Sequence, residues 1–147
     1  MTEKIAITVA AVIEQNHRFL LVEERSNEHI VFNQPAGHLE PGETLLEAVI
    51  REVSEETGFS FQPVALLGFF LWNNKEANTA FLRLAFIGDA YPPNSTPILD
   101  EEIITTHWLR KKDVLAKQSQ LRSPLVLRCI NDYLDGVRYP LSILKYL

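Results

Sequence analysis

The segment from residue 37 to residue 59 constrains the fold of this 147-residue chain more than any other part. Its second half predicts a helix over 44–57. Thr44 followed three residues later by Glu47 is a capping-box pattern, and Gly58 supplies a left-handed stop. Apolar residues recur every three or four positions between these ends and predict one buried stripe. The segment therefore predicts a well-bounded amphipathic helix that begins directly after a glycine-containing loop.

Three carboxylates share one side of this helix. Residues three and four apart lie on the same face, so Glu52, Glu55 and Glu56 project together. Like charges at this spacing destabilise a helix, and Arg51 offsets only part of the repulsion. A costly cluster on a well-capped helix suggests an external cation, and oxygen-only ligands favour Mg²⁺ or Mn²⁺ over Zn²⁺.

The loop before the helix contains two glycines, Gly37 and Gly42. Without a side chain at Gly37, a carbonyl oxygen can approach a metal, or an amide can approach a phosphate. The loop and helix together predict a cradle that holds a divalent metal ion against a diphosphate. A metal there neutralises phosphate oxygens and polarises phosphorus toward attack by water.

The rest of the chain alternates strand-like and helical patterns. Strands are expected over 5–13, 18–24, 30–32, 64–72, 79–87 and 103–109, a weaker helix over 112–118, and another helix opened by Ser123 with Pro124 in its first position. We expect the first two strands to form a hairpin, and three prolines make 91–97 a loop. This order predicts an α/β (α+β) fold with a mixed β-sheet and helices on its faces.

Composition limits the class of protein. The length predicts a single domain over residues 1–147. A net charge of −5 argues against an extended RNA or DNA surface, although metal ions let an acidic protein bind a small phosphorylated molecule. The lone Cys129 excludes an internal disulfide, and the sequence has neither a signal-peptide pattern nor a membrane-length apolar run. We therefore expect a cytoplasmic protein without membrane contact.

The 37–59 segment resembles the signature of the Nudix hydrolases: a glycine, five residues, Glu, seven residues, then Arg-Glu-apolar-x-Glu-Glu-x-Gly-apolar. Its fixed positions are filled by Gly37, Glu43, Arg51, Glu52, Val53, Glu55, Glu56, Gly58 and Phe59. The resemblance implies a Nudix fold, with a mixed β-sheet sandwiched between helices. It also implies hydrolysis of a nucleoside diphosphate linked to a further group.

The same resemblance implies roles for individual residues. Glu52, Glu55 and Glu56 correspond to metal-binding carboxylates, the Gly37 carbonyl to a further ligand, and Arg51 to a partner that orients a glutamate. Mg²⁺ is the implied cofactor, and Mn²⁺ is a possible substitute.

Many family members place another carboxylate downstream, as a ligand or general base. The acidic run at residues 100–102 is where it falls here. Glu102 is preferred because it directly precedes the apolar start of the strand at 103–109.

Shorter pieces outside the signature resemble the NudJ subgroup of the family. They lie at 33–40, 81–83, 121–126 and 138–141, so they extend over most of the chain. This resemblance implies Mg²⁺-dependent release of phosphate from nucleoside tri- and diphosphates, and hydrolysis of hydroxymethylpyrimidine and thiamine pyrophosphates.

Four residues are candidates for substrate binding. Trp72 ends an apolar strand and is either a stacking platform for a base or a plain core or rim aromatic. Arg83 interrupts an apolar strand and either clamps a phosphate or lies on the solvated face. Arg122 and Ser123 stand at a helix start, where they either bind an anion or simply cap the helix.

Two other functions remain open at this level. One is a pyrophosphohydrolase for ADP-ribose, nucleotide sugars or capped RNA, which releases a nucleoside monophosphate. The other is a non-catalytic nucleotide sensor, for which metal carboxylates are expected to be lost or a DNA-binding region added. The complete signature and the short chain favour the enzyme. The sequence allows a monomer or a homodimer.

Overall fold

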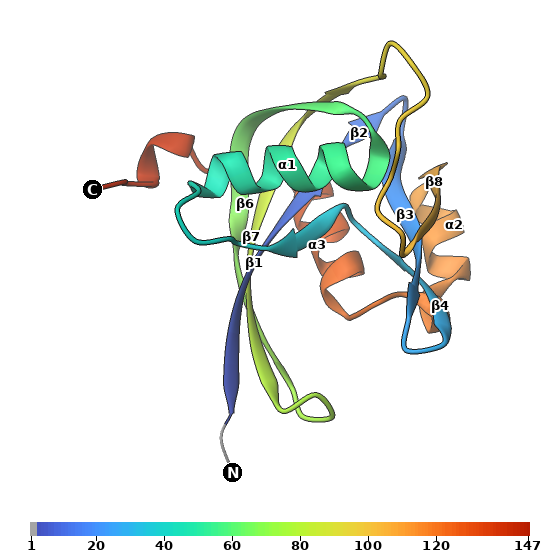
Figure 1. The fold of residues 1–147 in the computed structure, drawn as a ribbon, viewed down its shortest axis with the longest axis horizontal. Helices are drawn as coiled ribbons and strands as arrows, with labels where there is room; N and C mark the ends of the chain where they lie inside the picture. The colour runs from blue at the N-terminus through green and yellow to red at the C-terminus, as the bar shows by residue number, and fades with distance from the viewer. Residues whose placement is uncertain (1–2) are drawn as a thin grey trace.

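The computed structural model describes residues 3–147 as two β-sheets with helices packed around them (Figure 1). In chain order the elements are β1 (Lys4–Val12), β2 (Glu14–Gln15), β3 (Arg18–Ser26), β4 (His29–Asn33), β5 (Ala36–His38), α1 (Leu45–Thr57), β6 (Ser60–Asn74), β7 (Thr79–Tyr91), β8 (Ile103–Leu109), α2 (Lys111–Ala116), the 3₁₀ helix η1 (Gln118–Gln120), α3 (Leu125–Leu134) and the 3₁₀ helix η2 (Leu141–Ile143). The expected α/β fold is confirmed.

The larger sheet is mixed, and the smaller one is antiparallel. Strands of the larger sheet are ordered β5-β1-β7-β6, with β1 parallel to β7 and the other pairs antiparallel. In the smaller sheet β3 is the centre and pairs with β2, β4 and β8. Helix α1 covers one face of the larger sheet, and α3 packs on the other (Figure 1).

The expected hairpin between the first two long strands is wrong. β3 pairs with the two-residue β2, whereas β1 pairs with β5 and β7 in the other sheet. Residues 9–13 are buried on both faces, and such a strand belongs in the middle of a covered sheet. The chain crosses between the sheets at Ile13, whose carbonyl accepts a hydrogen bond from the Leu20 N–H at 3.0 Å.

Helix α1 begins and ends as its sequence predicts. The Thr44 hydroxyl accepts the Glu47 N–H, the Glu47 carboxylate accepts the Thr44 N–H, and Gly58 adopts φ 78°. Val49 and Val53 are fully buried against the larger sheet. This packing fixes the rotation of α1 and places Glu52 and Glu56 beside the apolar stripe, where both are buried.

Two smaller predictions need correction. Gly37, expected in the loop before the helix, lies in the short strand β5, where it pairs with Val9. Helix α3 starts at Leu125, and Pro124 is its N-cap rather than its first helical residue. The Ser123 hydroxyl still accepts the Leu125 N–H at 3.1 Å, in a short turn just before α3.

Candidate active site

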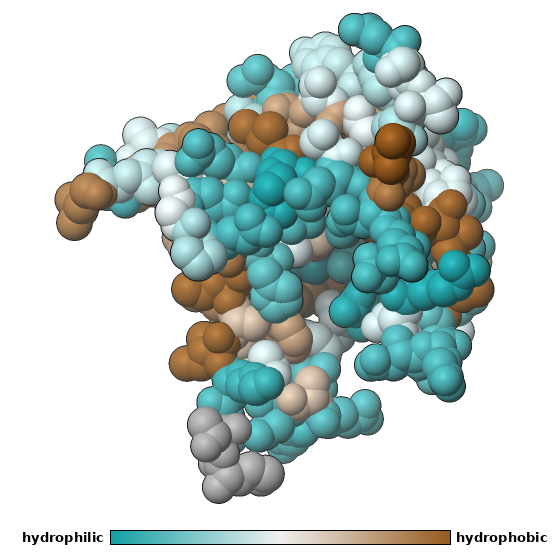
Figure 2. Space-filling model, in the orientation of Figure 1, coloured by the Kyte–Doolittle hydropathy of each residue, from teal (hydrophilic) through white to brown (hydrophobic). Residues whose placement is uncertain are grey.

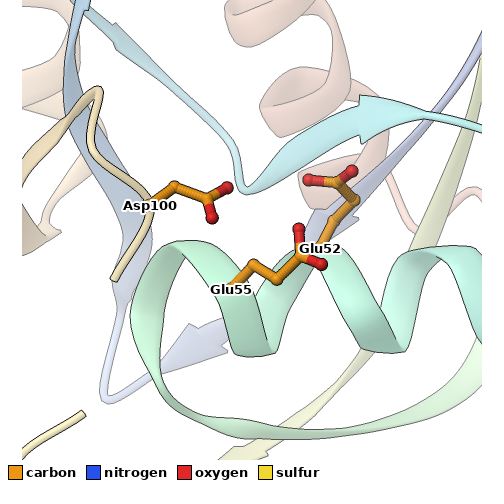
Figure 3. Close-up of side chains that lie close together, drawn as sticks. All are labelled: Glu52, Glu55 and Asp100. Atoms are coloured by element: carbon orange, nitrogen blue, oxygen red, sulfur yellow. The ribbon is translucent and has the colours of Figure 1, made fainter. Parts of the chain in front are cut away.

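Three carboxylates from two distant parts of the chain converge beside α1. One oxygen each of Glu52, Glu55 and Asp100 lies within 4.8 Å of the others. Figure 3 shows Asp100 reaching from the loop before β8 toward the helix that carries the two glutamates. Clustered carboxylate oxygens are the donor set of a hard divalent cation. The residues present therefore fit a divalent metal ion at this point.

Arg51 holds this cluster together on its outer side. Its guanidinium donates to the Glu52 carboxylate at 2.8 Å, to Glu55 at 3.2 Å and twice to Glu43 at 2.7 and 3.0 Å. The hydrogen bond from Arg51 lowers the pKa of Glu43, and the same contacts raise the pKa of Arg51. Arg51 therefore contacts several glutamates at once and offsets part of their repulsion.

Glu56 lies deeper than the cluster. Burial raises its pKa to about 9, although its carboxylate accepts the Ala36 N–H at 2.9 Å. Burial also raises the pKa of Glu52 to about 7, against the lowering effect of Arg51. Without a cation, charge on these two groups is costly, and such strongly shifted carboxylates mark a functional site.

The acidic run at 100–102 contributes Asp100 to the carboxylate cluster, whereas the sequence interpretation preferred Glu102. The Asp100 N–H donates to the Glu55 carbonyl at 3.0 Å, which ties this loop to α1. Glu102 lines the same cavity, and its carbonyl accepts the Arg25 N–H at 2.9 Å. Both residues are thus available near the site, and Asp100 is the one that the sequence interpretation did not choose.

A large cavity extends from the carboxylates across the larger sheet toward the start of α3. Its volume is about 1410 Å³, and Figure 2 shows hydrophilic residues around the hollow beside α1. The predicted residues that line it are Gly37, Arg51, Glu52, Glu55, Glu56, Trp72, Arg83, Glu102, Arg122 and Ser123. The fold thus brings all predicted site residues to one cavity.

Two of the substrate-binding candidates come from neighbouring strands. Trp72 on β6 is half-buried, and its ring stacks on Phe81 of β7 with centroids 5.7 Å apart and planes at 23°. Arg83 lies on β7 and is only 4% exposed, so its placement on a solvated face is excluded.

Arg122 and Ser123 line the opposite side of the cavity. The exposed Arg122 pairs with Glu24 at 2.7 Å, and Glu24 is itself buried. The charge of Glu24 contributes to the raised pKa of Glu56. Sequence analysis missed Glu24, because an acidic residue in β3 carries no signal until pairing with β8 and β4 places it at the cavity.

These features define a hydrolase of phosphoanhydride bonds, and the chain belongs to the Nudix family. The NUDIX domain family matches residues 4–129, which include the whole of the carboxylate cluster and α1. The phosphatase NudJ of Shigella boydii is 42% identical over 138 residues, covering 94% of this chain and 89% of that protein.

Solved structures agree with this family. The NUDIX hydrolase from Nitrosomonas europaea superposes with a TM-score of 0.94 at 47% identity, covering 98% of each chain. The NUDIX domain of Shewanella oneidensis NrtR, complexed with ADP ribose, has a TM-score of 0.70 at 15% identity, over 92% of this chain and 89% of that chain. The latter likeness concerns the fold alone.

Of the helices within residues 3–147, none is both long enough and apolar enough to cross a membrane.

Proposed function

We propose that this chain is a Mg²⁺-dependent phosphatase that releases inorganic phosphate from nucleoside di- and triphosphates, and from hydroxymethylpyrimidine or thiamine pyrophosphate. The observation that carries the proposal is the continuity of one cavity, from the carboxylates at α1 to Arg83 and the Trp72 ring. Such a cavity can hold phosphates at one end and a heterocycle at the other. The similarity to phosphatase NudJ supports the choice of released product.

The metal-binding residues in this proposal are Glu52, Glu55 and Glu56, with the Gly37 carbonyl as a further ligand and Asp100 added from the structure. When bound, Mg²⁺ neutralises phosphate oxygens and polarises phosphorus toward attack by water. The carboxylates suit Mg²⁺ or Mn²⁺ because all donors are hard oxygens.

The protein's own groups position the reactants. Arg51 keeps the Glu52 and Glu55 carboxylates in place, and burial of Glu56 gives its carboxylate a high proton affinity. Glu102 or Asp100 acts as the general base that accepts a proton from water, because both line the cavity. No covalent intermediate is required, since positioning and charge are sufficient for phosphoryl transfer to water.

The remaining proposed residues hold the substrate. The Trp72 ring offers a face for a purine or pyrimidine, and Arg83, Arg122 and Ser123 supply donors to phosphate oxygens. We also propose one Nudix domain over residues 1–147, acting in the cytoplasm as a monomer or homodimer. A buried, unpaired Cys129 is compatible with a reducing compartment.

A panel of nucleotides and pyrimidine pyrophosphates tests the proposal, with phosphate, pyrophosphate and monophosphate measured separately. Predominant phosphate release in Mg²⁺, lost on chelation, is expected. Glu56→Gln serves as the inactive control, because it removes a carboxylate of the metal site without changing its volume. Predominant release of pyrophosphate or nucleoside monophosphate would instead assign a pyrophosphohydrolase, and the ADP-ribose and nucleotide-sugar arms of the panel detect it.

A further inference from the structure

Arg83 brings a positive charge to the cavity wall that no carboxylate balances. Its side chain is 4% exposed, and within residues 3–147 no Asp or Glu oxygen approaches it to 4.0 Å. Arginine stays protonated in proteins, and a buried charge is unfavourable without a partner. By contrast, Arg51 and Arg122, the other arginines predicted for this site, both contact glutamates. The environment of Arg83 is therefore suited to an incoming anion.

The protein groups that Arg83 contacts are all uncharged. Its guanidinium donates to Gln34 Oε1 at 2.9 Å and to Asn33 Oδ1 at 3.1 Å, and it lies 3.9 Å from Cys129 Sγ. Its Nε–H is buried and has no hydrogen-bond partner. A guanidinium has five N–H donors, so these contacts leave part of its donor capacity unused.

Asn33 extends this donor surface. Because arginine offers only donors, the amide oxygen of Asn33 must face Arg83, and its NH₂ group then points elsewhere. That NH₂ group has no partner among the residues the structure describes, and Asn33 lines the cavity. The wall formed by Arg83 and Asn33 thus offers hydrogen-bond donors and positive charge together.

This wall is close to the carboxylate cluster. His38 of β5, Thr8 of β1 and Arg83 of β7 are in register across three neighbouring strands. With strands about 4.8 Å apart, the backbone of Arg83 lies roughly 10 Å from that of His38, which follows Gly37 directly. Because the carboxylates and Arg83 line the same cavity, a phosphate chain that starts at the carboxylates has a continuous path toward Arg83.

We propose that Arg83 and Asn33 form an oxyanion subsite that binds a phosphoryl group outside the carboxylate cluster. This inference rests on the proposed function, because it assigns the second end of the same cavity. The subsite favours substrates with at least two phosphoryl groups over monophosphates. It also offers a place for the phosphate that the reaction releases.

Asn33→Asp is the main test, because it preserves shape while placing a carboxylate next to Arg83 and removing the NH₂ donor. The KM for a nucleoside triphosphate is expected to rise about tenfold or more, with a smaller change in kcat. Arg83→Met removes the charge itself, and since it also disturbs packing, its melting temperature is measured alongside. Arg128→Gln is the matched control, because Arg128 is exposed and pairs with Asp132 away from this cavity.

A second measurement does not depend on catalysis. Inorganic phosphate is expected to raise the melting temperature of the chelator-treated wild type and of Arg128→Gln, and to have little effect on Asn33→Asp. Sodium chloride at equal ionic strength controls for screening. Loss of phosphate protection with an unchanged KM would assign the subsite to released phosphate, whereas both effects together assign it to the substrate. Equal responses of wild type and Asn33→Asp in both assays would overturn the subsite.

Failure of the proposed function gives a different pattern. In that case no nucleotide or pyrophosphate yields phosphate, yet phosphate still protects the wild type and not Asn33→Asp.

Discussion

Gly37 lies so close to the carboxylate of Glu52 that a side-chain carbon on its Cα would overlap the carboxylate atoms. The Glu52 carboxylate therefore occupies the space beside strand β5 that a side chain at residue 37 would fill. The backbone at Gly37 does not have a positive φ, so a larger residue here would displace the end of the Glu52 side chain rather than strain the backbone. The first position of the Nudix signature thus controls the position of a carboxylate that follows it by fifteen residues.

Gly37→Ala is expected to displace the Glu52 carboxylate while leaving the backbone conformation allowed. Loss of a group that supports a metal ligand costs roughly 10–100-fold in metal affinity or activity, and we expect a drop of that size here. Mg²⁺ titration followed by calorimetry, together with turnover, measures it. The melting temperature in chelator serves as control and should change little. A variant with wild-type Mg²⁺ affinity would show that the position of Glu52 does not matter.

The pKa values of Glu56 and Glu52 predict how the metal-free protein responds to pH. Both are raised by burial, to about 9 and about 7, from an ordinary value of 4.5. Between pH 5 and 9 the folded state therefore binds more protons than the unfolded chain, and the free energy of unfolding falls as pH rises. One such group contributes a slope of at most about 1.4 kcal/mol per pH unit.

Urea unfolding in chelator at pH 5, 7 and 9 checks this prediction. Glu56→Gln should flatten the pH dependence between 7 and 9, because it removes the titrating group with the higher pKa. Mg²⁺ should restore stability to the wild type at pH 9, since a cation balances the ionised carboxylates. A free energy of unfolding of the wild type that stays constant or rises between pH 5 and 9 would contradict the raised pKa of Glu56.

Local signals explain which parts of the structure the sequence could predict. Helix α1 was predicted with its caps because Thr44, Glu47 and Gly58 act within one or two turns. The pairing of β1 could not be predicted, because its parallel partner β7 follows about 75 residues later. The sequence of a hydrophobic strand does not indicate which other strand it pairs with. The expected hairpin failed for this reason.

The same distinction applies to the site. Glu52 and Glu55 share a side because of the helical repeat, which the sequence shows directly. Asp100 joins them only because the loop before β8 packs against α1, where its Pro97 sits over Gly58 and its Asp100 N–H bonds to Glu55. That packing is a tertiary contact, so the sequence located the acidic run at 100–102, and its preference for Glu102 rested only on the place of that residue next to the strand.

Asp100→Asn and Glu102→Gln separate these two carboxylates. Asp100→Asn is expected to weaken Mg²⁺ binding about tenfold or more, because its oxygen belongs to the three-carboxylate cluster. Glu102→Gln is expected to leave Mg²⁺ affinity closer to wild type and, if Glu102 is the general base, to lower kcat and change its pH profile. A larger loss of Mg²⁺ affinity in Glu102→Gln than in Asp100→Asn would identify Glu102 rather than Asp100 as the metal ligand.

Trp72→Ala tests whether the ring that borders the cavity contacts the substrate. Stacking of a base on an aromatic side chain is worth roughly 1–3 kcal/mol, so the KM for a nucleotide should rise about tenfold with little change in kcat. Phe69→Ala is the matched control, because Phe69 lies on the same strand, is 56% exposed and does not line this cavity. Both variants remove an aromatic ring from β6, so a general loss of strand stability affects both.

Inorganic pyrophosphate, which has no ring to stack, should bind equally well to wild type and to Trp72→Ala. Equal KM increases in the two variants would show that Trp72 is a structural aromatic on the rim of the cavity.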